Sequence, residues 1–354
     1  MASSGMTSRE RVMQAFEHKE TDKVPRWCGA SDEFWAKAKS ELDLDDEGLR
    51  RRFGDDFRRV YSRYKGPSHE LGENITWESP FGVQRKGIGY GQPTSHPLAD
   101  ITSVKDAENY PWPDPDWVET GHIKDDAKQW GGEYAVLGGE WSPFWHDVID
   151  LVGHERLYFM MYDYPETAEY LFSKVTDYYY QVSKRTFEEA SGMVDIFFIG
   201  NDLGGQNGPL LGVDLFRRFL LPPIKRLIDL GHRHGLKVMM HCCGGYRPLI
   251  PDMIKAGMDG LHALQPDAAG MEPAKLKRDF GGSILLNGGI DSKRVLIDGE
   301  SPEWVRQETV KTLEIMAPGG GYIGGASHDT ILEETPVKNV LAMFDAIEDF
   351  RLHR

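Results

Sequence analysis

The segment Leu236–Gly245, LKVMMHCCGG, sets a short apolar run directly before a histidine, two cysteines and two glycines. A run of this length is typical of a strand buried in a parallel sheet. Residues that follow such a strand lie at the carboxyl edge of the sheet, where α/β enzymes carry their active sites. We therefore expect His241 and Cys243 to stand at the functional end of a buried strand.

Similar apolar runs recur on either side of this segment, separated by helical patterns. The further expected strands are 134–137, 195–199, 260–264, 283–286 and 321–323, and the expected helices include 166–189, 302–316 and 336–350. This alternation predicts a parallel α/β sheet. A strand at 24–28 and one from the range 75–91 raise the number to eight, which closes a (β/α)8 TIM barrel. A doubly wound open sheet is the alternative, and the absence of a G-x-G-x-x-G turn after any strand disfavours it.

The first hundred residues predict additions to this barrel. Residues 7–18 have the spacing of an amphipathic helix, and residues 34–61 form a charged segment with a helical pattern. Residues 75–91 are rich in β-formers and glycine, as in a hairpin. We expect one α/β barrel domain over residues 1–354, with N-terminal helical and hairpin additions.

The composition limits the class of partner. Of the 354 residues, 40% are hydrophobic and 27% are charged, with a net charge of −15 that argues against a nucleic-acid partner. No apolar run is long enough to cross a membrane, and the start of the chain lacks the order of a signal peptide. Three cysteines, two of them adjacent, suit a reducing compartment. We expect a cytoplasmic protein with a small-molecule substrate, and the tyrosines at 158, 162 and 164 make a homodimer a further expectation.

The pair His241 and Cys243 predicts a metal site. In extended backbone, side chains two positions apart point to the same side, so these two face one centre while Cys242 faces away. An imidazole and a thiolate suit Zn²⁺, and a catalytic zinc needs a third protein ligand and an open position. The donor-bearing residues that follow other strands are Glu140, Asp202, His328 and Asp329. A nucleophilic Cys–His pair is the alternative, but one strand leaves its base little freedom to reach the thiol.

Other strand ends supply polar and aromatic side chains. The expected catalytic residues are Asp202, Glu140 and His328, because an acid in a partly closed site can have its pKa shifted towards neutrality. The expected substrate-binding residues are Trp141, Trp145, Gln265 and Asn287. A pocket walled by such side chains would take a flat or hydrophobic small molecule.

Four groups of residues are shared with a known family. They are 7–12 with 22–25 (TSRERV and DKVP), 241–251, 265–271 and 287–291 (NGGID). Together they resemble the uroporphyrinogen decarboxylase superfamily, which also contains zinc-dependent methyltransferases acting on methylcobamide, coenzyme M and methoxylated compounds. The resemblance implies a (β/α)8 barrel, in agreement with the strand count.

The resemblance is nearer to the methyltransferase branch. True uroporphyrinogen decarboxylases carry an arginine-rich segment after the first strand that clamps substrate carboxylates, whereas residues 27–34 here contain two acids and no arginine. The methyltransferase branch carries an H-x-C at the strand matched by His241 and Cys243, and several members add a cysteine near the last strand, where this chain has residues 327–329 (SHD). The resemblance thus implies zinc bound by His241 and Cys243, with His328 as the third ligand that we expect.

Three functional hypotheses follow. The first is a zinc-dependent methyltransferase-like enzyme that moves a methyl group between a methoxy compound or thiol and a corrinoid, which is carried on a separate protein because the chain has no D-x-H-x-x-G corrinoid pattern. The second is a metal-free decarboxylase of a carboxylated small molecule, with Asp202 or His328 as proton donor. The third is a catalytically silent ligand-binding barrel, which the number of ionisable groups at the strand ends disfavours.

Overall fold

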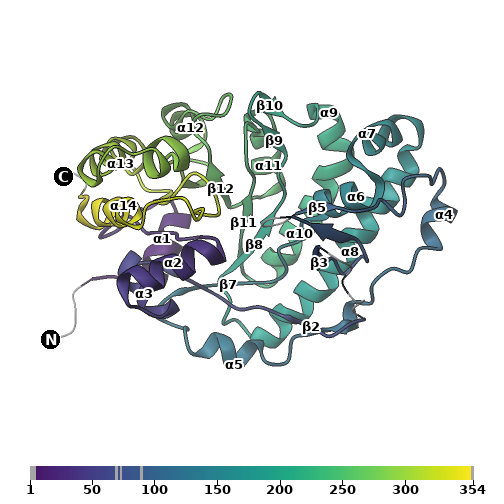
Figure 1. The fold of residues 1–354 in the computed structure, drawn as a ribbon, viewed down its shortest axis with the longest axis horizontal. Helices are drawn as coiled ribbons and strands as arrows, with labels where there is room; N and C mark the ends of the chain where they lie inside the picture. Colours follow the sequence, from purple (N-terminus) through teal and green to yellow (C-terminus); the bar gives the residue numbers. More distant parts are fainter. Residues whose placement is uncertain (1–4, 68–70, 72–73, 88–90, 352–354) are drawn as a thin grey trace.

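The core of the structure is a curled parallel sheet, in a computed structural model that describes residues 5–67, 71, 74–87 and 91–351. The strands lie in the order β1 (Phe57–Arg59), β7 (Ala135–Gly138), β8 (Ile196–Gly200), β11 (Lys237–His241), β12 (Gly260–Leu264), β13 (Leu285–Gly288) and β14 (Tyr322–Ile323). Every neighbouring pair in this order is parallel. Helices surround the sheet (Figure 1).

Residues 25–27 close the sheet into a barrel. Trp27 donates its backbone N–H to Gly324 beside β14, at 3.0 Å, and Gly324 donates to Pro25 at 2.8 Å. On the other side, the N–H of Asp56, next to β1, donates to the carbonyl of Arg26 at 3.0 Å. The short segment therefore serves as the eighth parallel strand, and the expected (β/α)8 TIM barrel is confirmed.

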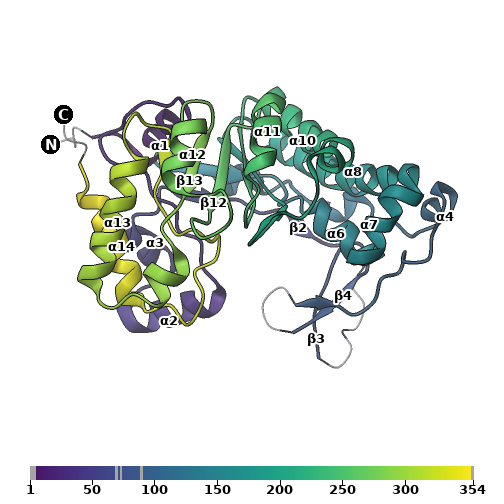
Figure 2. The ribbon, with the colours of Figure 1, turned by 90° about the horizontal axis from the view of Figure 1, so that it is seen from above.

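One expected barrel strand was wrong. The range 75–91 forms β3 (Ile75–Glu78) and β4 (Gln84–Lys86), which pair antiparallel with each other and, through β4, with β5 (Gln92–Pro93), and this hairpin sheet projects from the barrel (Figure 2). Residues 88–90 lie outside the described part of the chain. The barrel strand is instead β1, inside the range 34–61 that was expected to be helical. Two of its three residues are arginines, so it lacks the apolar run typical of a buried strand.

Most of the rest of residues 34–61 is helical, as expected. It contains α2 (Asp32–Leu42) and α3 (Asp46–Phe53), which precede β1 in the chain. The helices that alternate with the strands are α6 (Phe144–Val152), α7 (His154–Asp163), α8 (Pro165–Ala190), α10 (Leu221–Arg233), α11 (Ile250–Ala256), α12 (Pro273–Phe280), α13 (Pro302–Met316) and α14 (Val337–Asp349). No helix among the described residues is both long and apolar enough to span a bilayer.

The amino-terminal end of the barrel is plugged by α1 (Ser8–Phe16). Its Thr7 and Glu10 form a capping box, and its Val12, Ala15 and Phe16 pack into the same core cluster as the inward-facing side chains of the strands. This cluster includes Phe57, Leu137, Phe198, Met239, Leu285 and Ile323. The barrel is thus closed below by α1 and filled along its axis.

Beside α1 lies a fully paired group of charges, which we call the bottom ion cluster: Arg11, Asp22 and Asp56. Arg11 donates to Asp22 at 2.7 and 3.0 Å, to Asp56 at 2.9 Å and to the carbonyl of Met6 at 2.8 Å. Asp56 also accepts the backbone N–H of Arg26 at 2.7 Å. The shared motifs TSRERV and DKVP therefore join the first helix to the closing strand, a structural task.

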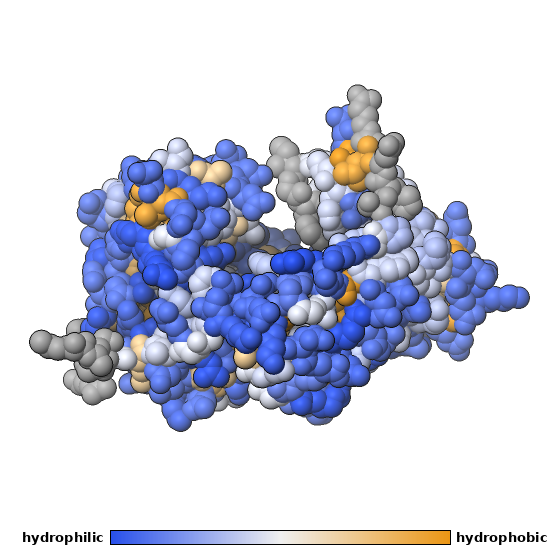
Figure 3. Space-filling model, turned by 90° about the horizontal axis from the view of Figure 1, so that it is seen from below, coloured by the Kyte–Doolittle hydropathy of each residue, from blue (hydrophilic) through white to orange (hydrophobic). Residues whose placement is uncertain are grey.

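The opposite end of the barrel is open. Figure 3 shows the surface hollowed between the side of the molecule that carries α2 and the projecting hairpin sheet. The carboxyl ends of all eight strands face this hollow, because parallel strands of one barrel end on the same side. We therefore expect the functional site at this end of the barrel.

Candidate metal centre

Three donor atoms meet at the ends of β8 and β11. His241 is the last residue of β11 and pairs in register with Gly200, the last residue of β8, so the residues just beyond both strands are neighbours. The sulfur of Cys243 lies 3.3 Å from Nε2 of His241, and a carboxylate oxygen of Asp202 lies 3.2 Å from the same nitrogen. We call Asp202, His241 and Cys243 the donor triad.

The expected divergence of the two adjacent cysteines is visible in their contacts. Cys242 is fully buried on the other side of the strand end, where its sulfur accepts the N–H of Leu203 at 3.3 Å. Cys243 points with His241 to the triad, as extended backbone requires. Its own N–H donates to Asp202 at 2.8 Å, which fixes the carboxylate beside the sulfur.

Glycines let the two strand-end loops touch through bare backbone. A side chain on Gly204 would place its Cβ 2.6 Å from the carbonyl oxygen of Cys243 and 2.7 Å from the backbone of Gly244. Gly245 donates its N–H to the carbonyl of Gly205 at 2.8 Å. Because these backbone atoms cannot move aside cheaply, the glycines keep Asp202 and Cys243 together.

The protonation of the triad follows from burial and charge. Burial favours the neutral form of Asp202, but the hydrogen bond and charge of His241 and the charge of His146 outweigh it and hold the pKa of Asp202 well below its usual range. Burial also raises the pKa of the Cys243 thiol, and the Asp202 carboxylate raises it further. Without a cation between them, the carboxylate therefore opposes formation of a thiolate.

A second group of donors adjoins the triad on the other side of His241. His262, at the register position of β12 opposite His241, places its Nδ1 3.1 Å from Nδ1 of His241 and 3.7 Å from the Asp329 carboxylate. Its Nε2 is buried without a hydrogen-bond partner among the described residues. Burial lowers the pKa of His262 to about 3, so the ring is neutral. Atoms that can bind a metal thus lie next to both ring nitrogens of His241.

These atoms fit a zinc ion. Tetrahedral zinc with bonds of about 2.0–2.3 Å separates its ligand atoms by roughly 3.6 Å. The triad offers one nitrogen, one sulfur and one oxygen, with all its donor atoms within 4.8 Å of one another. Three protein ligands are the set of a catalytic site, in which the fourth position is open. Asp329 forms a second such group with His241 and His262.

The expected ligand His328 lies in neither group. Its Nδ1 accepts the N–H of Thr330 at 3.1 Å, and its own N–H donates to the hydroxyl of Ser292 at 3.1 Å. The ring is thereby held in a turn after β14, and the adjacent Asp329 is the side chain that reaches the donors. Its predicted roles as metal ligand and catalytic residue stay predictions.

The other two expected catalytic residues differ in surroundings. Asp202 belongs to the triad, as described above. Glu140, just after β7, accepts a hydrogen bond from the hydroxyl of Ser62. Its own backbone N–H donates to the hydroxyl of Ser183 at 2.9 Å. Burial raises the pKa of Glu140, although Ser62 and Arg59 partly oppose this. Glu140 therefore keeps its proton to a higher pH than an exposed glutamate does.

The expected substrate-binding residues are spread over several environments. The ring of Trp141 lies 5.4 Å from that of His241, at the edge of the triad. Gln265 accepts the N–H of Gly244 and so supports the loop after β11. Asn287 is fully buried, with Oδ1 lacking a described partner. Trp145 is 1% exposed and stacks on Phe172 in the outer core, so the structure places it away from the triad.

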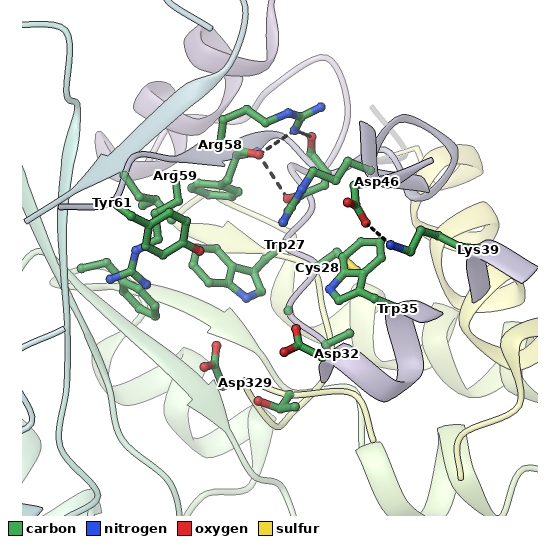
Figure 4. Close-up of a pocket in the computed structure, with 18 residues that line it drawn as sticks. Trp27, Cys28, Asp32, Trp35, Lys39, Asp46, Arg58, Arg59, Tyr61 and Asp329 are labelled. Atoms are coloured by element: carbon green, nitrogen blue, oxygen red, sulfur yellow. Dashed lines mark hydrogen bonds and ion pairs between the residues drawn. The ribbon is translucent and has the colours of Figure 1, made fainter. Parts of the chain in front are cut away.

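A cavity of about 520 Å³ opens beside the donors (Figure 4). Aromatic rings from four elements form much of its wall: Trp27, Trp35, Phe57, Tyr61 and Phe198. Asp329 lines the cavity and also faces His262, so the cavity and the second donor group share a side chain. A space of this size suits a small molecule.

Two residues of this region were not expected from the sequence. His262 sits inside an apolar strand, where a histidine looks like a core residue; its position level with His241 on the next strand is the signal that could have revealed it. Arg59 ends β1 and lines the cavity, but the charged sequence around it was interpreted as a helix. Both are found only once the strand order is known.

Comparison with known proteins agrees with this geometry. A family model described as uroporphyrinogen decarboxylase (URO-D) matches residues 95–350, which include the donor triad. The chain belongs to the uroporphyrinogen decarboxylase family. A member from Alkalilimnicola ehrlichii, named uroporphyrinogen decarboxylase, is 26% identical over 273 residues, which are 73% of this chain and 69% of that protein.

A solved structure extends the likeness to nearly the whole chain. A methyltransferase from Methanosarcina mazei superposes with a TM-score of 0.66 and 18% sequence identity, over 97% of this chain and 99% of that one. At this identity the likeness shows a common fold. It confirms the barrel together with its N-terminal additions, which lie before the residues that the family model matches.

Proposed function

We propose that this member of the family is a zinc-dependent methyltransferase-like enzyme. It would move a methyl group between a small methylated substrate, a methoxy compound or a thiol, and a corrinoid carried on a separate protein. The observation that carries the proposal is the meeting of Asp202, His241 and Cys243 at the open end of the barrel. The fold shared with the Methanosarcina mazei methyltransferase supports it.

The triad would hold the metal, and the surrounding residues would bind and orient the substrate. Zinc at this position would supply a Lewis acid for the substrate's thiol or ether oxygen. Trp141 covers His241 and would place a flat substrate beside it. Glu140, whose pKa is raised by burial, would hold a proton for an oxygen that loses its methyl group.

The partners follow from the same proposal. The corrinoid would be presented to the open end by another protein of the reducing cytoplasm. The side chains of Phe159 and Tyr162 on α7 are 57% and 72% exposed, and the homodimer expected from the tyrosines of this region remains a prediction. The protein would act as one barrel domain.

Decarboxylation is the second candidate, because the Alkalilimnicola ehrlichii relative is named a decarboxylase. In that reaction Asp202 or His328 would deliver a proton to the carbon that loses carbon dioxide. The depressed pKa of Asp202 disfavours this role, since the group stays ionised. Release of carbon dioxide from a carboxylated substrate by metal-free protein would favour this candidate over methyl transfer.

Metal analysis of the purified protein tests the proposal. We expect about one zinc per chain in the wild type and almost none in Cys243→Ala, which loses one of three ligands. Cys242→Ala is the matched control, because the neighbouring sulfur faces Leu203 and not the triad. A wild-type protein that binds no zinc, or a Cys243→Ala variant that retains it, would overturn the zinc-dependent mechanism.

A further inference from the structure

The cavity contains four basic side chains, and three of them are already paired within the chain. Lys39 lies 3.0 Å from Asp46, Arg50 lies 2.8 Å from Asp55, and Arg58 lies 2.8 Å from Glu47. Each of these cations is therefore neutralised where it stands, and Figure 4 shows the pair of Lys39 with Asp46. A ligand with many carboxylates would have to displace the chain's own acids to use them.

The fourth cation, Arg59, is different. Among the described residues no carboxylate lies within 4.0 Å of its guanidinium, and its Nε is buried without a hydrogen-bond partner. Arg59 lies close enough to Glu140 for its charge to lower the pKa of that carboxyl. The carboxyl, however, accepts its hydrogen bond from the hydroxyl of Ser62. A guanidinium that no carboxylate neutralises can pair with an anionic group of a ligand in the cavity.

Aromatic rings surround this free cation. The guanidinium carbon lies 5.2 Å from the centre of the Tyr61 ring, 5.8 Å from that of Trp141 and 5.7 Å from that of Phe198. Figure 4 shows Arg59, Tyr61 and Trp27 together at one end of the cavity, and Lys39 and Asp46 at the other. The walls thus suit a flat ring, and the forked donors of Arg59 suit a planar carboxylate.

Trp141 lies between Arg59 and the donor triad. Trp141 contacts the Arg59 guanidinium on one side and lies 5.4 Å from His241 on the other. The acids Asp32 and Asp329 line other parts of the cavity, so an anionic group is favoured only at the Arg59 end. Asp329 also belongs to the second donor group, so the cavity in which such a ligand would lie adjoins the metal side.

We propose that Arg59 anchors a single carboxylate of an aromatic substrate, so that the enzyme accepts aromatic monoacids and discriminates against neutral analogues. This inference rests on the proposed function for the nature of the transferred group, a methyl on the end of the ring opposite the carboxylate. The anchoring itself is a binding property, and it can be measured without turnover.

Calorimetric titration with a matched pair of probes tests the proposal. We expect 4-methoxybenzoate to bind the wild type at least about tenfold more tightly than 4-methoxybenzamide, which is about 1.4 kcal/mol. Arg59→Gln should remove this preference by weakening the acid and leaving the amide unchanged, and Arg59→Lys should restore part of it. Arg63→Gln is the control, because Arg63 is an exposed cation nearby on β2 (Arg63–Tyr64).

The outcomes separate this proposal from the function. The role of Arg59 is overturned if the wild type binds the acid no more tightly than the amide, or binds neither at millimolar concentration. It is also overturned if folded Arg59→Gln still prefers the acid. The wild-type comparison decides the matter if that variant fails to fold. Zinc content is unaffected by these results, so loss of the anchor with zinc retained leaves the proposed function intact, and the reverse result leaves the anchor intact.

Discussion

Both ends of the barrel carry a group of ionisable side chains, but only the group at the closed end contains a fixed cation. At the closed end, Arg11 of the bottom ion cluster donates to Asp22, Asp56 and a backbone carbonyl, all between 2.7 and 3.0 Å. At the open end, the two nitrogens of His241 face another histidine nitrogen, a thiol and a carboxylate. The atoms around His241 are nitrogens, a sulfur and an oxygen that can bind a metal ion in place of a proton, whereas the closed end already holds its cation, Arg11.

This difference separates stability from binding. A buried ionic group whose members are all paired contributes to the fold, and its loss leaves uncompensated charge. A buried group of nitrogen, sulfur and oxygen atoms without a fixed cation can instead bind a metal ion. The comparison predicts that substitutions at the closed end change unfolding, whereas those at the open end change metal and ligand binding.

The largest effect on stability is expected for Arg11→Met. Removal of the cation leaves Asp22 and Asp56 without their partner, at a cost of about 3–5 kcal/mol in unfolding free energy. Urea unfolding measures this, and the exposed pair Lys19 and Glu17 provides the control, because Lys19→Met should change stability by less than about 0.5 kcal/mol. A loss below about 1 kcal/mol for Arg11→Met would remove the distinction between the two ends.

At the open end, Asp202→Asn should weaken zinc binding by at least about 100-fold, since even residues outside the ligand set cost up to that much. The amide still accepts the N–H of Cys243, so the local backbone is kept. Competition with a chelator gives the affinity, and the unfolding free energy of the metal-free protein should change by less than about 1 kcal/mol. Unchanged zinc affinity would show that Asp202 is not a ligand.

A smaller effect is expected where the strand-end loops touch. Gly204→Ala would force the loop away from the carbonyl of Cys243 and should lower zinc affinity by about tenfold, although no ligand is altered. Gly212→Ala is the matched control, because a Cβ there meets no atom within 4 Å. Equal zinc affinity in both variants would mean that the glycine contact does not position the triad.

The smallest effect concerns acid pH at the closed end. Burial favours the neutral form of Asp22, but the hydrogen bond and charge of Arg11 outweigh it, so its pKa is lower in the folded state than in the unfolded one. Its contribution to stability is therefore full above about pH 4 and is lost as the pH falls through the folded pKa. Thermal melts should show a weaker loss on acidification for Asp22→Asn than for the exposed control Asp214→Asn; parallel curves would contradict this.

The sequence predicted those parts of the barrel in which each strand is buried on both faces. The runs at 195–199 and 260–264 could be identified because strands buried on both faces are mostly apolar along their length. The strand β1 could not be identified from the sequence, because two of its three residues are arginines that line the cavity. Charged residues inside a strand do not give the apolar or alternating pattern by which strands are predicted. Its place was wrongly given to a segment of the hairpin sheet.

The site was predictable as far as a single strand extends. The spacing of His241 and Cys243 fixes their common direction, so their convergence followed from the sequence alone. Asp202 was one of four candidates for the third ligand, because the choice depends on which strand neighbours β11. His262 and Arg59 needed the full strand order, which no local pattern contains.

The backbone contact between Gly204 and Gly244 also limits how such a barrel can diversify. Two loops that touch without side chains have no room for inserted residues, so lengthening either one would pull the metal ligands apart. New specificities would then arise on the opposite rim, in the segment from Gly29 to Tyr61, where the cavity wall is built from separate helices and short turns. The rim with the metal would stay constant across relatives while the other rim changes with the compound that each accepts.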